Sequence, residues 1–74
     1  MLYANIIVAS RTNVQELTYA IPAAIIPYIR VGGTVMVPLR RQLVRGVVIK
    51  LVRNVPVAIK GRIKEIESID RSGA

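Results

Sequence analysis

The feature that most constrains this chain is a pair of strand-forming runs separated by three residues. Residues 34–39 (TVMVPL) and 43–53 (LVRGVVIKLVR) are rich in Val, Leu and Ile, and only Arg-Arg-Gln at 40–42 lies between them. A connection this short predicts an antiparallel β-hairpin. Alternation then places Val35 and Val37 on the same face of the first strand.

The second run of the hairpin carries apolar residues at both odd and even positions for much of its length. A strand with one face in water alternates apolar and polar residues, so this pattern predicts a strand buried on both faces, as in a curled sheet or partial barrel. Gly46 interrupts the run and predicts a bulge or bend, because small sheets curl at such positions.

Two further strands are expected in the N-terminal part of the chain. Residues 2–9 are apolar and rich in strand formers, and the polar residues 10–13 end them in a turn. Residues 17–21 form a second short strand that stops at Pro22, because proline has no N–H to donate to a sheet ladder.

Two segments have an ambiguous pattern. Residues 23–29 admit a helical turn, but Pro27 excludes a long helix. From residue 57 onward the isoleucines fit one face of a helix, while residues 63–69 also fit an edge strand. The expected fold class is all-β, a small curled antiparallel sheet or partial barrel of about five strands, with room for a short helical turn.

The length of 74 residues limits the chain to a single domain. We assign this domain to residues 1–70 and expect residues 71–74 to form a tail or the start of a linker to a further C-terminal part. The longest apolar run, residues 19–29, has 11 residues and includes two prolines, whereas a membrane span needs about 20 apolar residues. No signal-peptide pattern is present, so we expect a cytoplasmic protein with no membrane partner.

Composition excludes several chemistries. The chain has no cysteine and no histidine, so Cys/His zinc sites, cysteine nucleophiles and Ser-His-Asp triads cannot form. Gly32 and Gly33 are a glycine pair outside any phosphate-binding motif. We therefore expect no enzyme activity, no cofactor and no small-molecule substrate.

The distribution of charge indicates a polyanionic partner. The formal net charge is +7, and between Glu16 and Glu65 there are nine basic residues and no acidic one. The nine are Arg30, Arg40, Arg41, Arg45, Lys50, Arg53, Lys60, Arg62 and Lys64. An unbalanced positive field attracts polyanions, and nucleic acid is the commonest of these in a cytosol.

Three other interpretations stay open at this point. The basic residues can simply keep an apolar domain soluble. The chain can be a small basic β-barrel that binds structured RNA. It can also be a protein-interaction module whose apolar surface docks on a partner. Charge alone does not separate DNA binding from RNA binding.

Short motifs along the chain have a familiar order and spacing. They are L-T-Y-A-I-P at 17–22, V-G-G-T-V-M-V-P-L-R-R at 31–41 and R-G-V-V-I at 45–49. The series resembles the N-terminal DNA-binding domain of the primosomal protein N-prime family, the PriA-type replication-restart helicases. That family has a pattern close to F-[DT]-Y-x-x-P, a glycine, V-x-V-P-F-G, a basic hairpin and G-[IV]-V. The resemblance covers residues 4–70.

The resemblance implies a small β-rich domain that captures the free 3′-hydroxyl end of a nascent DNA strand at a stalled replication fork. Such a domain performs no chemistry itself. The implied partner is DNA, as a branched fork or a primer 3′ end, and single-stranded DNA-binding protein and other primosome proteins are further candidates. The hairpin would present arginines to phosphates beside a pocket for the terminal nucleotide.

The resemblance also implies site residues. Leu17 stands where the family has an aromatic residue, and Thr18 where it often has an acid, on the strand that faces the terminal nucleotide. Arg40 stands at the glycine after V-P-F, so a cation replaces a residue that allows close backbone approach. Lys64 corresponds to a family lysine, and Lys60 is its rival because the alignment crosses a loop of variable length.

Three more residues complete the expected DNA-binding set. Tyr19 is a candidate base platform, although a tyrosine at a strand position is more often a packing residue. Arg41 and Arg45 flank the hairpin loop, and we expect both to contact phosphates. Their removal should have little effect on folding, because charges on a solvent-facing loop contribute little to stability.

Overall fold

The computed structural model describes residues 2–9 and 13–70; the expected tail at 71–74 and residues 10–12 of the expected turn lie outside this part. The strands form one sheet and comprise β1 (Tyr3–Ala9), β2 (Val14–Ala20), β3 (Thr34–Leu39), β4 (Gln42–Val52) and β5 (Ser68–Ile69). Two short helices accompany them, the 3-10 helix η1 (Ala23–Tyr28) and the α-helix α1 (Val57–Lys60).

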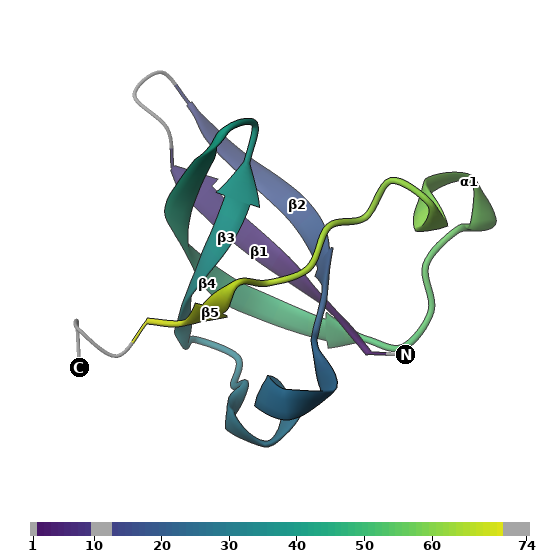
Figure 1. Ribbon diagram of the computed structural model, residues 1–74, viewed down its shortest axis with the longest axis horizontal. Coiled ribbons are helices and arrows are strands. Elements are labelled where there is room, and N and C mark those ends of the chain that lie inside the picture. Colours follow the sequence, from purple (N-terminus) through teal and green to yellow (C-terminus); the bar gives the residue numbers. More distant parts are fainter. Residues whose placement is uncertain (1, 10–12, 71–74) are drawn as a thin grey trace.

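The five-stranded sheet has the order β2-β1-β4-β3-β5, and all pairings between these strands are antiparallel. The sheet curls, and the segment between α1 and β5 runs across the side that lies between β2 and β3 (Figure 1). On that side Ala20 of β2 forms a parallel bridge with Glu65, while β5 pairs with β3. The sheet is thus a partial barrel left unclosed, which confirms the predicted fold class.

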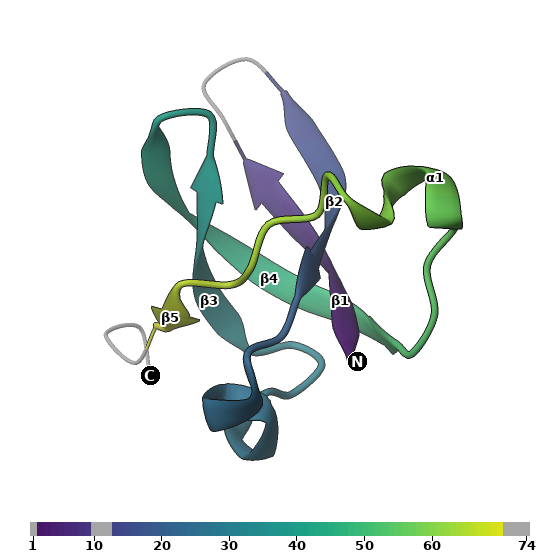
Figure 2. The same cartoon turned by 45° about the vertical axis from the view of Figure 1, so that its right-hand side comes forward.

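The core fills the inner side of the curled sheet. It is made of Ala4, Ile6, Val8, Tyr19, Ile21, Ile29, Val35, Val37, Val48 and Ile66. Val35 and Val37 lie on the same inner face of β3, as the alternation predicts. Ile66 belongs to the segment that crosses between β2 and β3 (Figure 2), so this segment contributes to the core as well as bridging the two strands.

The hairpin of β3 and β4 is confirmed, but the prediction that β4 is buried on both faces is wrong. Leu43, Val47, Ile49 and Leu51 are exposed by 53, 41, 40 and 38%. The physical reason is that the described part of the chain forms a single sheet, and one curled sheet can cover only its inner face. Leu43 and Val47 lie on the outer face of β4 and therefore meet solvent. Leu51 pairs with the core residue Ala4 and is exposed near the end of the strand.

The bulge lies at Ile49 and not at Gly46. The register between β1 and β4 shifts between Asn5 and Ile6, which leaves Ile49 as the extra residue. Gly46 instead pairs regularly with the strands on both sides. A Cβ atom at Gly46 would collide with Cγ2 of Ile6, so this glycine allows the inner faces of β1 and β4 to pack closely.

The first ambiguous segment is helical, and the second contains both a helix and a strand. Residues 23–28 form η1 with Pro27 inside it, and the chain from residue 57 makes one turn of helix that ends at Gly61. The later part of that segment then supplies the edge strand β5. Within residues 2–9 and 13–70, no helix is long and apolar enough to cross a membrane.

Candidate nucleic-acid interface

The sheet is unclosed between β2 and β3 (Figure 2), and two hydrogen bonds place several expected site residues around this opening. The backbone N–H of Ala20 donates a hydrogen bond of 2.9 Å to the carbonyl oxygen of Lys64. The Tyr19 hydroxyl donates one of 2.8 Å to the carbonyl oxygen of Pro38, close to the hairpin tip. We call the surface around these contacts the open-side surface, and define it by Leu17, Tyr19, Arg40 and Lys64.

Tyr19 is a core residue within this surface. Its ring is buried, and its hydroxyl is used in the bond to Pro38 that links β2 to β3. Burial raises the pKa of the Tyr19 phenol above its ordinary value of 10.0, because the charged form loses solvation. The position favours packing over base stacking, since little of the ring is accessible.

Leu17 and Thr18 point to opposite faces of β2, as neighbouring residues of a strand must. Leu17 packs against the core from the inner face. Thr18 donates a hydrogen bond of 2.9 Å from its hydroxyl to Oδ1 of Asn5, its partner on β1. The structure therefore brings Leu17, but not Thr18, to the open-side surface.

Arg40 occupies the tip of the hairpin in an unusual backbone conformation. Its φ of 59° is the one positive value at a non-glycine residue in the described part of the chain. This left-handed region favours glycine, which is the residue that the resembled family has at this position. Arg40 thus retains a backbone shape suited to glycine while adding an exposed cation, and Arg41 beside it is exposed as well.

Arg45 has a partner that the sequence did not reveal. Its Nε atom lies 2.5 Å from Oδ2 of Asp70, whose side chain is only 7% exposed, against 63% for Arg45. Asp70 directly follows β5, and Arg45 lies in β4. The ion pair therefore links the residue after β5 to the second strand of the hairpin. Because the two residues lie far apart in the sequence, no local sequence pattern predicts this contact.

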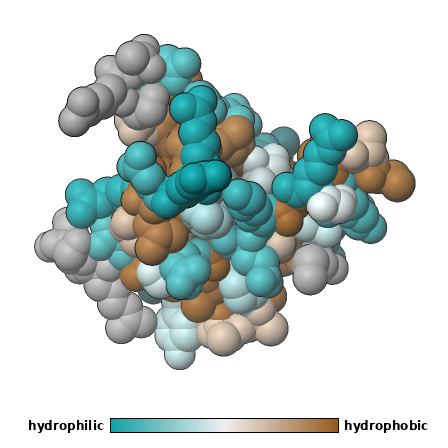
Figure 3. Space-filling model, turned by 45° about the horizontal axis from the view of Figure 1, so that its top comes forward, coloured by the Kyte–Doolittle hydropathy of each residue, from teal (hydrophilic) through white to brown (hydrophobic). Residues whose placement is uncertain are grey.

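The basic residues between Arg45 and Asp70 are exposed. Lys50, Arg53, Lys60, Arg62 and Lys64 all face solvent. Figure 3 shows a face on which hydrophilic and hydrophobic side chains are interspersed. Such a mixture can contact both the phosphates and the sugars or bases of a strand. Among the described residues, no group of three His, Cys, Asp or Glu could hold a metal ion.

Comparison with known families shows which family the chain resembles in sequence. The family model of the PriA 3′ DNA-binding domain (3′BD) matches residues 5–73. No curated protein and no solved structure matches the chain. The family match spans nearly the whole chain and agrees with the resemblance carried by the L-T-Y-A-I-P and V-M-V-P-L motifs. The chain belongs to the PriA 3′ DNA-binding domain family and is a DNA-binding module.

Proposed function

We propose that this domain captures the free 3′-hydroxyl end of a DNA strand and delivers it to a replication-restart helicase at a stalled fork. The observation that carries the proposal is the family match over residues 5–73. In this role the domain binds and positions a strand end, and primosome proteins are its further partners.

The open-side surface, together with the neighbouring hairpin residues Leu39 and Arg41, offers the two kinds of contact that a terminal nucleotide needs. Leu17 and Leu39 are partly buried apolar residues packed on the core, and they would meet the base or the sugar. Arg40 and Arg41 on the hairpin, and Lys64 beside the end of β2, would meet phosphates. Leucine has no π-face, so the contact with the base would be weak and tolerant of sequence.

Two residues expected from the sequence have no part in this proposal. Thr18 lies on the other face of β2, where its hydroxyl donates to Asn5. Arg45 is paired with the buried carboxylate of Asp70, which offsets its charge. The proposed phosphate contacts therefore depend on Arg40, Arg41 and Lys64.

The test compares matched oligonucleotides that carry a recessed 3′ end as either a free hydroxyl or a 3′-phosphate, by fluorescence anisotropy. A pocket sized for a hydroxyl should bind the phosphorylated end more weakly, because the phosphate adds bulk and about −1.5 to −2 charges. A plain basic surface should give the opposite order, since the extra phosphate strengthens attraction. Tighter binding of the 3′-phosphate would overturn the proposal, and a hairpin RNA serves as the competitor that separates DNA from RNA binding.

A further inference from the structure

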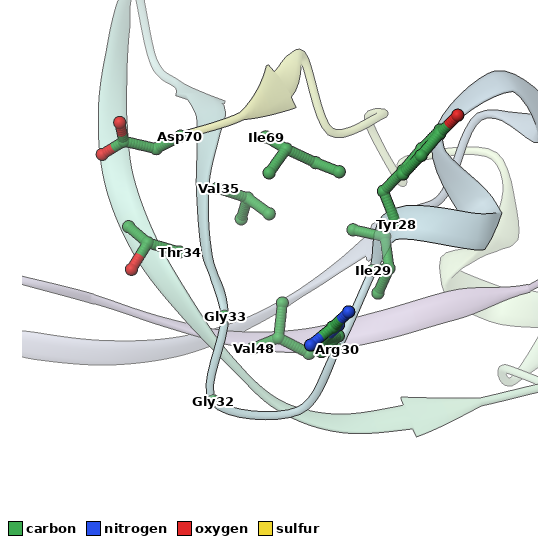
Figure 4. A pocket seen from close by; sticks show the side chains of 10 residues that line it. All are labelled: Tyr28, Ile29, Arg30, Gly32, Gly33, Thr34, Val35, Val48, Ile69 and Asp70. Carbon is green, nitrogen blue, oxygen red and sulfur yellow. The ribbon is translucent and has the colours of Figure 1, made fainter. Parts of the chain in front are cut away.

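A pocket of about 460 Å³ lies away from the open-side contacts, among η1, the turn before β3 and the end of β5 (Figure 4). Tyr28 lines it from the end of η1 and Arg30 from the chain that follows, while Val35 and Ile69 line it from β3 and β5. Apolar side chains from two strands thus meet an aromatic ring and a guanidinium group at one concavity.

The turn that carries Arg30 is held firmly. Gly32 has a φ of 90°, which glycine adopts at little cost. The N–H of Gly33 donates to the carbonyl oxygen of Arg30 at 2.9 Å, and the N–H of Gly32 donates to that of Val48 at 2.7 Å. Both glycine amides are therefore occupied by the chain itself, and Arg30 is attached to a fixed turn beside β4.

Tyr28 differs from the other aromatic residues of the protein. The chain has three tyrosines and no phenylalanine or tryptophan. Tyr3 and Tyr19 are 5% and 4% exposed, whereas Tyr28 is 57% exposed. Tyr28 is thus the aromatic side chain whose ring a base could reach, and it lies at the pocket.

The charges around the pocket favour an anionic ligand on the side of this ring. Figure 4 shows Tyr28 and Arg30 on one side of the pocket, while the Asp70 carboxylate points away from them. That carboxylate is also paired with Arg45. A phosphate beside Arg30 would therefore meet a cation without facing an uncompensated acid.

We propose that this pocket holds an unpaired nucleotide of the bound DNA, with its base stacked on Tyr28 and its phosphate on Arg30. Base–aromatic stacking tolerates any base, and a guanidinium group matches a phosphate through paired hydrogen bonds. A peptide would find the amides of Gly32 and Gly33 already occupied, which favours a nucleotide over a protein segment. The inference rests on the proposed function in that its ligand is DNA, but it concerns a separate surface.

The test uses one duplex with a recessed 3′-hydroxyl end, prepared with and without a single-stranded template overhang. Tyr28→Ala should weaken binding to the overhang DNA by about tenfold, since stacking supplies that order of affinity per base. Tyr28→Phe should bind like the parent because it keeps the ring. Arg30→Gln should weaken binding by about threefold through the loss of one phosphate contact. Ile26→Ala is the control, because this exposed residue of η1 does not line the pocket.

A titration with a short oligothymidine supplies a direct reading. The amide NMR signals of Gly32, Gly33 and Thr34 should shift, and tyrosine fluorescence should fall in the parent but not in Tyr28→Ala. Wild-type affinity in Tyr28→Ala, equal losses in Tyr28→Phe and Tyr28→Ala, or unmoved glycine signals would each overturn the inference.

Failure of this inference can be told apart from failure of the proposed function. If the parent prefers 3′-hydroxyl ends but Tyr28→Ala binds overhang DNA normally, the pocket inference alone is wrong. If Tyr28→Ala loses affinity while the parent shows no preference for a 3′-hydroxyl end, the end-capture proposal alone is wrong.

Discussion

The open-side surface and the pocket beside η1 offer a nucleic acid different contacts. The open-side surface carries the family motifs and several exposed cations, but its aromatic residue, Tyr19, is buried in the core. The pocket carries an exposed ring at Tyr28 and a single cation at Arg30. A sequence motif can therefore reflect packing, as at Tyr19. Whether a side chain can stack on a base depends on its exposure in the fold, as at Tyr28.

The two surfaces share β3 as a common support. Val35 lines the pocket, and the carbonyl of Pro38 accepts the hydrogen bond from Tyr19 at the open side. Val37, which is 0% exposed, lies between them. A change at Val37 should abolish both surfaces at once, whereas changes on one surface should leave the other intact.

The largest expected effect is that of Val37→Asp. An unpaired carboxylate in the core should cost about 4 kcal/mol or more, which is most of the stability of a domain this small. Thermal unfolding followed by circular dichroism should show no cooperative transition, and DNA binding should be lost. Val57→Asp is the control on the highly exposed α1; similar melting of both variants would contradict this assignment of the core.

The ion pair of Arg45 changes the expectation for the two hairpin arginines. Arg45→Ala removes a partner of the buried Asp70 carboxylate and should lower the free energy of unfolding by about 1–2 kcal/mol. Arg41→Ala should change it by less than about 0.5 kcal/mol. Urea denaturation measures both, and Asp70→Asn should recover part of the loss when combined with Arg45→Ala. Equal stability of Arg41→Ala and Arg45→Ala would show that the pair contributes nothing.

Salt dependence should separate the two surfaces further. With about three to five phosphate contacts, the slope of log K against log salt on single strands should be about −2 to −3.5. Arg41→Ala should reduce its magnitude by about 0.7, whereas Tyr28→Ala should lower affinity with no change in slope, because stacking releases no counterions. A flat salt response in the parent would favour a protein-docking role instead.

The hairpin and the fold class were predictable because they follow from local rules. Only three polar residues separate the two apolar runs, so the chain must reverse direction in a short turn. Pro22 and Pro27 exclude long helices. The exposure of Leu43 and Val47 was not predictable in this way. The sequence does not show whether a second layer of structure covers an apolar side chain. In the described part of this chain there is one sheet, so these side chains stay exposed.

The candidate site could be predicted only in part from the sequence. Strand alternation alone could have separated Leu17 from Thr18, because adjacent residues of β2 cannot face the same pocket. The contact between Arg45 and Asp70 depends on β5 returning beside the hairpin, which no local pattern encodes. The pocket at Tyr28 was missed because exposure of a ring depends on the completed fold.

A smaller effect than that of the core substitution is expected at Tyr19, whose hydroxyl links β2 to β3 across the open side. Tyr19→Phe removes this hydrogen bond and should cost about 0.5–1.5 kcal/mol at neutral pH. It should also weaken discrimination between 3′-hydroxyl and 3′-phosphate ends without changing the effect of Tyr28→Ala, since neither Tyr19 nor Pro38 lines the pocket beside η1.

The pH dependence gives Tyr19→Phe a second signature. Burial raises the pKa of the Tyr19 phenol in the folded protein, whereas the phenol of the unfolded chain ionises near its ordinary pKa of about 10. Above that pH the unfolded state binds fewer protons than the folded state, so the free energy of unfolding falls as pH rises. The contribution of Tyr19 is thus fully present below about pH 10 and is lost as pH rises through the folded pKa.

Urea denaturation of the parent and Tyr19→Phe from neutral to alkaline pH should show their free energies of unfolding converging, with Tyr28→Phe as the control. A difference that stays constant with pH would contradict burial of this phenol in the folded state.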